Sequence, residues 1–148
     1  MSDASTTTED PQVTAPAFKN KEQVRDFLIH AITKNKLDIA HFLFEKCSVL
    51  IDEIFADQDK KLHNALVFAS DKGYSEIVDL ILEKGEGKLN TESIEAAFNS
   101  SSKAGQANVK DLLFKKVNLS EGSVERLMYS CIENGDLDAV QRLFEKAK

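Results

Sequence analysis

The sequence predicts an all-α protein, a solenoid of about four antiparallel helical hairpins. The chain of 148 residues contains only two prolines and six glycines, in a background rich in Lys, Glu, Leu and Ala. This composition favours helices over strands. The segment from Asp71 to Gly85 (DKGYSEIVDLILEKG) is a short turn followed by an amphipathic helix, and degenerate copies follow Asn35, Gly105 and Gly135. One such helix cannot bury its apolar face alone, so we expect the copies to stack.

The chain divides into a tail and one repeat domain. Residues 1–18 hold both prolines, are rich in Ser, Thr, Ala and Asp, and show no hydrophobic period. We therefore expect a disordered N-terminal tail. Residues 19–148 are expected to form the helical-repeat domain, with repeats at about 20–47, 60–85, 90–117 and 120–147.

Each repeat is numbered from its turn residue, which is Asn35, Gly73, Gly105 or Gly135. The first helix of each repeat is recognised by three offsets from this residue. Offsets of −11, −7 and −4 differ by four and three residues, so they lie on one helix face. They hold Val24, Leu62, Ile94 and Val124, then Leu28, Leu66, Phe98 and Met128, then the small residues Ala31, Ala69, Ser101 and Cys131. These residues are expected to be buried.

The second helix has its apolar face at offsets +4, +5, +7 and +8. These are Ile39, Ala40, Phe42 and Leu43, then Ile77, Val78, Leu80 and Ile81, then Val109, Lys110, Leu112 and Leu113, then Ala139, Val140, Arg142 and Leu143. Lys110 and Arg142 interrupt the pattern, and we expect their long side chains to extend to solvent.

Turn and capping residues set the expected ends of the helices. Gly or Asn at each hairpin turn suits a left-handed helix end. Helix starts are expected at Asn20, Thr91 and Ser120. The last repeat is expected to act as a cap with a polar outer side.

The connection between the first two repeats is longer than the others. In residues 48–61, a short extra helix is expected to pack over the groove between repeats. Its apolar residues are Val49, Leu50, Ile54 and Phe55.

Charge and composition restrict the classes of function. The net charge is −6, and both signs are mixed along the chain, which disfavours a sequence-independent nucleic-acid binder. There is no secretory signal and no apolar run of bilayer-spanning length, so we expect no membrane contact and a cytoplasmic or nuclear location. Cys47 and Cys131 are expected to be reduced, buried thiols.

No pattern in the chain indicates catalysis. The three histidines, His30, His41 and His63, have no metal-ligand spacing. There is no phosphate-binding glycine loop, calcium loop or activated serine. We therefore expect a protein that is not an enzyme and has no catalytic residue, metal or cofactor.

The repeats resemble ankyrin repeats. GYSEIVDLILEKG (Gly73 to Gly85) closely follows that family's second-helix signature, and GDLDAVQRLFEK (Gly135 to Lys146) follows it in part. The family's Thr-Pro-Leu-His opening and its finger sequences are absent, so fingers are expected to be short or missing.

The resemblance implies a non-enzymatic protein–protein interaction module, an adaptor or inhibitor. Its partner contacts would lie at the hairpin turns and on the exposed side of the first helices. These turn residues are Thr33, Lys34, Asp71, Lys72, Lys103, Glu133 and Asn134.

Two alternatives stay open. Residues 28–47 and 127–147 are also similar to pentatricopeptide repeats, an RNA-binding family whose base-reading position would fall at Asp26, Asn64, Ala96 and Arg126. Three of the four copies have apolar residues at +4 and +7, which favours ankyrin-like packing. The second alternative is a small helical-bundle regulator, which would need a concave polar pocket. The oligomeric state also stays open, because an uncapped end could self-associate.

Overall fold

The computed structural model describes residues 21–46, 48–56 and 60–146, which contain α-helices, one 3₁₀ turn and no strand. The all-α prediction is confirmed. The predicted tail, residues 1–18, lies outside the described residues, as do Asn20 and Cys47. The elements are α1 (Lys21–Thr33), α2 (Leu37–Lys46), the 3₁₀ turn (Ser48–Leu50), α3 (Ile51–Ala56), α4 (Lys61–Lys72), α5 (Ser75–Lys84), α6 (Thr91–Ala104), α7 (Ala107–Lys116), α8 (Glu121–Asn134) and α9 (Leu137–Lys146).

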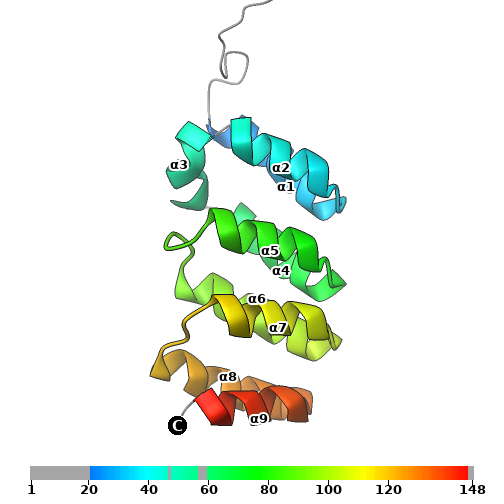
Figure 1. Cartoon of the computed structure of the whole chain (residues 1–148), viewed down its shortest axis with the longest axis vertical. Helices are drawn as coiled ribbons and strands as arrows, with labels where there is room; N and C mark the ends of the chain where they lie inside the picture. The colour runs from blue at the N-terminus through cyan, green and yellow to red at the C-terminus, as the bar shows by residue number, and fades with distance from the viewer. Residues whose placement is uncertain (1–20, 47, 57–59, 147–148) are drawn as a thin grey trace, which may run out of the picture.

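The helices pair in chain order and the pairs lie one after another (Figure 1). The pairs are α1 with α2, α4 with α5, α6 with α7, and α8 with α9. The first members, α1, α4, α6 and α8, each contact the next and form what we call the first-helix layer. The second members, α2, α5, α7 and α9, lie on the other side, where α5 contacts both α2 and α7. In Figure 1 the four tight turns between paired helices lie along one edge.

The turns have the left-handed backbone that the sequence predicted. Gly73, Gly105 and Gly135 have φ angles of 77°, 73° and 71°, and Asn35 has a φ of 57°. A side chain is disfavoured in this region, which explains why three of the four turns use glycine.

The helix starts agree with the prediction to within one residue. Ser120 caps α8, since its side chain accepts a hydrogen bond from the Ser123 backbone N–H. For α6 the capping residue is Asn90, not Thr91. The Asn90 side chain accepts from the Ser93 backbone N–H at 2.8 Å, and Thr91 is the first helical residue.

The core occupies the space between the two helix layers. All the −11, −7 and −4 residues are buried except Ile94 and Met128, which are half-buried. In α5 the four predicted core residues are all buried. In α2, by contrast, Ile39 and Phe42 are 53% and 56% exposed, because no described hairpin lies in front of the first one. Cys131 is buried, and burial raises the pKa of its thiol.

The extra helix between the first two hairpins is present as α3. Ile54 and Phe55 are buried, and the ring of Phe55 stacks on that of Phe44 with centroids 6.1 Å apart. Val49 was expected to join this packing, but it is 84% exposed. It lies in the 3₁₀ turn that precedes α3.

The expectation that Lys110 reaches solvent is wrong. Its side chain is 7% exposed and its Nζ lies 2.7 Å from Oδ2 of Asp136, whose side chain is 9% exposed. Arg142 fits the expectation better, with a side chain that is 40% exposed. It pairs with Asp111 of α7 and with Asp138 at 3.3 Å. Both basic residues therefore connect the last two hairpins.

The last hairpin does not have the polar outer side that was expected. Ile132, Leu137 and Phe144 are 59%, 68% and 62% exposed. These large side chains lie on α8 and α9, and no described helix follows to cover them.

Candidate functional site

Two grooves open on the first-helix layer. One lies between α6 and α8 and has a volume of about 500 Å³; the other lies between α1 and α4 and has a volume of about 540 Å³. The residues that line each groove all come from two neighbouring first helices, so helix packing forms the grooves without any inserted loop. We take these two grooves as the candidate functional site.

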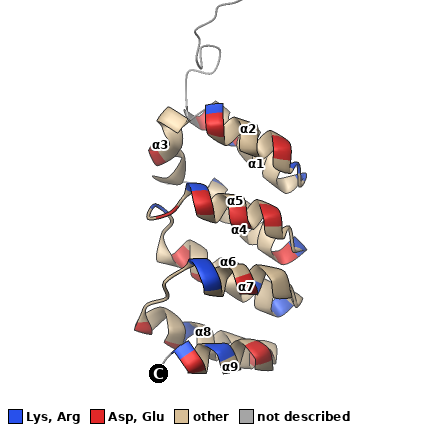
Figure 2. Ribbon diagram, in the orientation of Figure 1, with Lys and Arg blue, Asp and Glu red and all other residues tan. Residues whose placement is uncertain are grey.

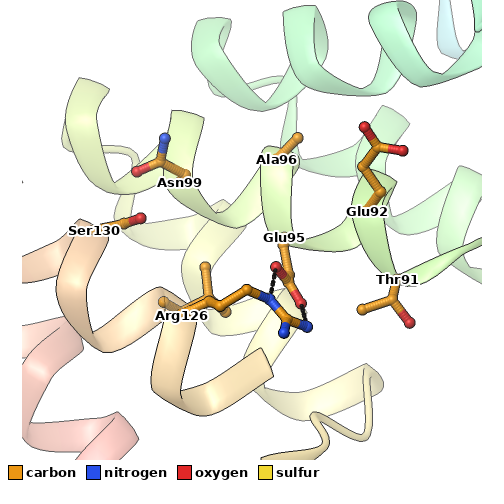
Figure 3. Close-up of a pocket in the computed structure, with 8 residues that line it drawn as sticks. Thr91, Glu92, Glu95, Ala96, Asn99, Arg126 and Ser130 are labelled. Atoms are coloured by element: carbon orange, nitrogen blue, oxygen red, sulfur yellow. Dashed lines mark hydrogen bonds and ion pairs between the residues drawn. The ribbon is translucent and has the colours of Figure 1, made fainter. Parts of the chain in front are cut away.

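An ion pair joins the two walls of the α6–α8 groove (Figure 3). The Arg126 guanidinium donates from Nε to Oε1 of Glu95 at 2.9 Å and from Nη2 to Oε2 at 2.7 Å. Ser123 donates a further hydrogen bond to Oε2 of Glu95 at 2.6 Å. These hydrogen bonds, that from Arg126 above all, lower the pKa of Glu95, and the carboxylate raises the pKa of Arg126. A two-point guanidinium–carboxylate pair holds the side chains in a defined geometry.

The rest of this groove combines small and polar side chains. Ala96 and Leu127 supply apolar surface, while Asn99 and Ser130 supply hydrogen-bonding groups further along the groove (Figure 3). The Asn99 side-chain oxygen accepts from the Asn134 amide at 3.0 Å. The groove therefore offers short, uncharged contacts between the Glu95–Arg126 ion pair and the turn end of the helices, and it also has the acidic side chain of Glu92.

The α1–α4 groove has a similar composition and one larger aromatic residue. Asp26 and Lys61 face each other across it, with 3.4 Å between Oδ1 and Nζ. Asn64 supplies an exposed amide, and Phe68 is 38% exposed at the groove. Because both partners of the ion pair are about half exposed, the pair contributes little to stability.

Small residues on α6 keep the α4–α6 contact close, between the two grooves. The Ser93 hydroxyl forms a hydrogen bond with Nδ1 of His63 at 2.8 Å, and Ser100 donates to the Val67 carbonyl at 3.5 Å. Ala97 is completely buried in the same helix. His63, which showed no metal-ligand spacing in the sequence, thus has a structural partner.

The seven turn residues predicted as partner contacts lie at the ends of the first helices, along the turn edge in Figure 1. Lys34, Asp71, Lys72, Lys103 and Glu133 are exposed. They do not gather into one cluster, because successive turns belong to successive hairpins. Their role in binding stays a prediction.

Two of these seven residues have contacts that connect them to the grooves. Thr33 lines the α1–α4 groove. Asn134 is half-buried, and its amide donates to the side chains of Asn99 and Ser102. Asn134 therefore has a structural role in holding α8 against α6.

The resemblance pointed to the exposed side of the first helices, where the grooves lie, but the groove residues Glu95, Asn99 and Ser130 were not named as partner contacts. A signal was present at the position considered for RNA base reading, because its four residues, Asp26, Asn64, Ala96 and Arg126, all line the two grooves. The same offset of −9 from each turn thus identifies the groove surface. Whether two neighbouring first helices diverge enough to leave a groove cannot be read from that spacing.

Charges of both signs are spread over the hairpins (Figure 2). Ion pairs connect successive hairpins, among them Lys84 with Glu45 and Lys116 with Asp79. Among the described residues, the lining of one groove contains a single arginine, Arg126, and that of the other a single lysine, Lys61, so neither lining forms a basic stripe. Within the described residues, no group of three or more His, Cys, Asp or Glu side chains could hold a metal ion. None of the helices described is long and apolar enough to cross a bilayer.

Comparison with known proteins gives no relative: no family model, no curated protein and no solved structure matches this chain.

Acidification is expected to destabilise the fold below about pH 4. The folded-state pKa values of Glu95 and Asp136 lie below their ordinary values. For carboxylates of this kind the stabilisation is present above the unfolded-state pKa and is lost as pH falls through the folded-state pKa. Urea unfolding at neutral pH and at about pH 3 measures the loss. Glu95→Gln should make the dependence on pH shallower, and an unchanged urea midpoint across this range would contradict the assignment.

Proposed function

We propose that the chain is a solenoid of degenerate, ankyrin-like helical hairpins with short or absent fingers, and that it acts as a non-enzymatic interaction module. Its binding surface for a protein partner is the first-helix layer, at the two grooves. The observation that carries this proposal is that both grooves open in the same layer, α1–α4 and α6–α8, on a surface built from successive helices. An extended surface of this kind is typical of helical-repeat binders.

The walls of each groove are connected before any partner arrives. The α6–α8 groove is spanned by the ion pair of Glu95 with Arg126, and the α1–α4 groove by the ion pair of Asp26 with Lys61. A preformed surface needs little ordering on binding, which favours affinity. Small residues and amides fit a protein segment that offers backbone hydrogen bonds and modest side chains.

Bulky, charged substitutions in the grooves are expected to weaken partner capture strongly. In affinity purification from native lysate, Asn64→Arg and Ser130→Arg should each lower recovery of the protein partner by about tenfold or more. Asn108→Arg is the matched control, because Asn108 is equally an exposed helical asparagine but lies on α7, in the other layer. Equal loss with Asn108→Arg, or no loss with either groove variant, would place binding elsewhere.

A second candidate, RNA binding, is favoured by one observation: the four residues at the pentatricopeptide base-reading position line the grooves. Against it stand the net charge of −6 and the acidic side chains of Asp26, Glu92 and Glu95 at the same surface. Purification at low and high salt distinguishes the two functions. RNA that is recovered at low salt and lost at high salt would replace the protein-binding proposal, because phosphate contacts weaken steeply with salt. Cytoplasmic or nuclear residence stays a prediction from the sequence.

A further inference from the structure

The two ends of the described hairpin stack expose large apolar residues at four repeat positions, of which −3 and +4 are buried in every other hairpin. At the C-terminal end these are Ile132 and Phe144, three residues before and nine after the turn glycine. At the N-terminal end they are Ile39 and Phe42, four and seven residues after Asn35. Their equivalents in the other hairpins show what each position contacts.

Positions −3 and +9 face the following hairpin. At −3, Ile32, Ser70 and Ser102 are at most 5% exposed, and Ser102 accepts a hydrogen bond from Asn134 of the next hairpin. At +9, Phe114 lies 5.4 Å from the Arg142 guanidinium of the next hairpin, whereas Phe44, which is 1% exposed, stacks on Phe55 of α3. The last hairpin has Ile132 and Phe144 here, the same residue types as Ile32 and Phe44 in the first. We call Ile132 and Phe144 the forward face.

Positions +4 and +7 face the preceding hairpin. At +4, Ile77, Val109 and Ala139 are completely buried. At +7, Leu80 is 5% exposed, and Arg142 pairs with Asp111 of the hairpin before it. The first hairpin has Ile39 and Phe42 at these positions. We call these two residues the rear face.

We propose that two copies of this chain associate head to tail, with the forward face of one copy docked on the rear face of the other. The occupant is a second copy because the two faces are the separated halves of the contact that already joins hairpins within the chain. The charges beside the two faces also support this head-to-tail arrangement. Within the chain, Glu45 at +10 pairs with Lys84 at +11 of the next hairpin. In the head-to-tail contact, Glu145 at +10 meets Lys46 at +11.

A contact between two different faces leaves one forward and one rear face free after each addition. Association therefore continues into longer oligomers unless a ring closes. An isologous contact, in which the same face meets itself, would stop at a dimer. This difference makes the orientation testable.

Two single variants and their mixture test the proposal by sedimentation velocity on the full chain. Phe42→Glu blocks the rear face and Phe144→Glu blocks the forward face. We expect the wild type to grow in mass with concentration, each variant to stay monomeric alone, and the equimolar mixture to form a 1:1 dimer of twice the monomer mass. Only the unblocked forward face of one variant and the unblocked rear face of the other can meet.

Val49→Glu is the control, since Val49 is 84% exposed, lies outside the aligned repeats and receives the same charge. It should associate like the wild type. Far-UV circular dichroism checks that each variant is folded. The single variants Ile39→Glu, on the rear face, and Ile132→Glu, on the forward face, repeat the test at other residues. The proposal is overturned if the wild type stays monomeric up to about 1 mM, if either blocked variant dimerises alone, or if the mixture does not associate.

Discussion

Replacing Lys110 with methionine is expected to lower the free energy of unfolding by about 3 to 5 kcal/mol. Methionine has a similar length, so the change removes the charge and leaves most of the packing volume. Asp136 then keeps a buried carboxylate without its cation. Burial acts to raise the pKa of Asp136, but hydrogen bonds from Lys110, Ser102 and the Ala139 N–H outweigh it and lower the pKa. Chemical denaturation monitored by circular dichroism measures the loss.

A second substitution separates the lost pair from other effects of the change. Asp136 also caps α9, where its Oδ1 accepts from the Ala139 N–H at 3.1 Å. Serine keeps a capping oxygen without the charge. The double variant, Lys110→Met combined with Asp136→Ser, should therefore recover at least half of the stability that Lys110→Met alone loses, because no unpaired charge remains buried. The residues equivalent to Lys110 in the other hairpins, Ala40, Val78 and Val140, are all apolar.

Lys115→Met is the matched control on the same helix. Lys115 is exposed, so its replacement should change stability by less than about 0.5 kcal/mol. If Lys110→Met costs no more than this control, the buried pair is not a stabilising contact in solution.

Replacing Ile81 with alanine is expected to cost about 2 to 5 kcal/mol of folding free energy. Ile81 is completely buried in α5, where it belongs to the apolar face that the sequence predicted. The change removes buried methyl groups and leaves a cavity that the neighbouring helices fill only in part. For a chain of this size, such a loss is a large share of the total stability.

Ile132→Ala is the same chemical change at an exposed site. Ile132 is 59% exposed on α8, so at dilute concentration its replacement should shift stability by less than about 0.5 kcal/mol. Equal denaturation midpoints for the two variants would show that Ile81 is not a core residue.

The sequence predicted the secondary structure because the signals involved are local. Gly73, Gly105 and Gly135 marked the left-handed turns, and the spacing of four and three residues marked the buried face of each first helix. The capping side chain at Ser120 was predicted correctly, and that of α6 was displaced by one residue to Asn90. Each of these features depends on residues within about one helical turn of each other.

The candidate site was much less predictable. The turn residues were named from a resemblance, whereas the grooves depend on how far α8 lies from α6 and α4 from α1. Glu95 and Arg126 are 31 residues apart in the chain, and neither has a sequence motif that predicts the other. Their pairing follows from the stacking of one hairpin on the next.

Periodicity and turn chemistry, both local, determined by themselves that this chain is helical and where most of its helices begin and end. Tertiary structure alone decided which apolar positions are covered. Ile77 and Ile39 occupy the same offset from their turns, yet Ile77 is buried and Ile39 is 53% exposed. The hairpin of Ile77 lies between two others, whereas no described hairpin precedes that of Ile39. Tertiary structure also buried Lys110 beside Asp136, since a neighbouring hairpin supplies the carboxylate that makes a buried ammonium tolerable.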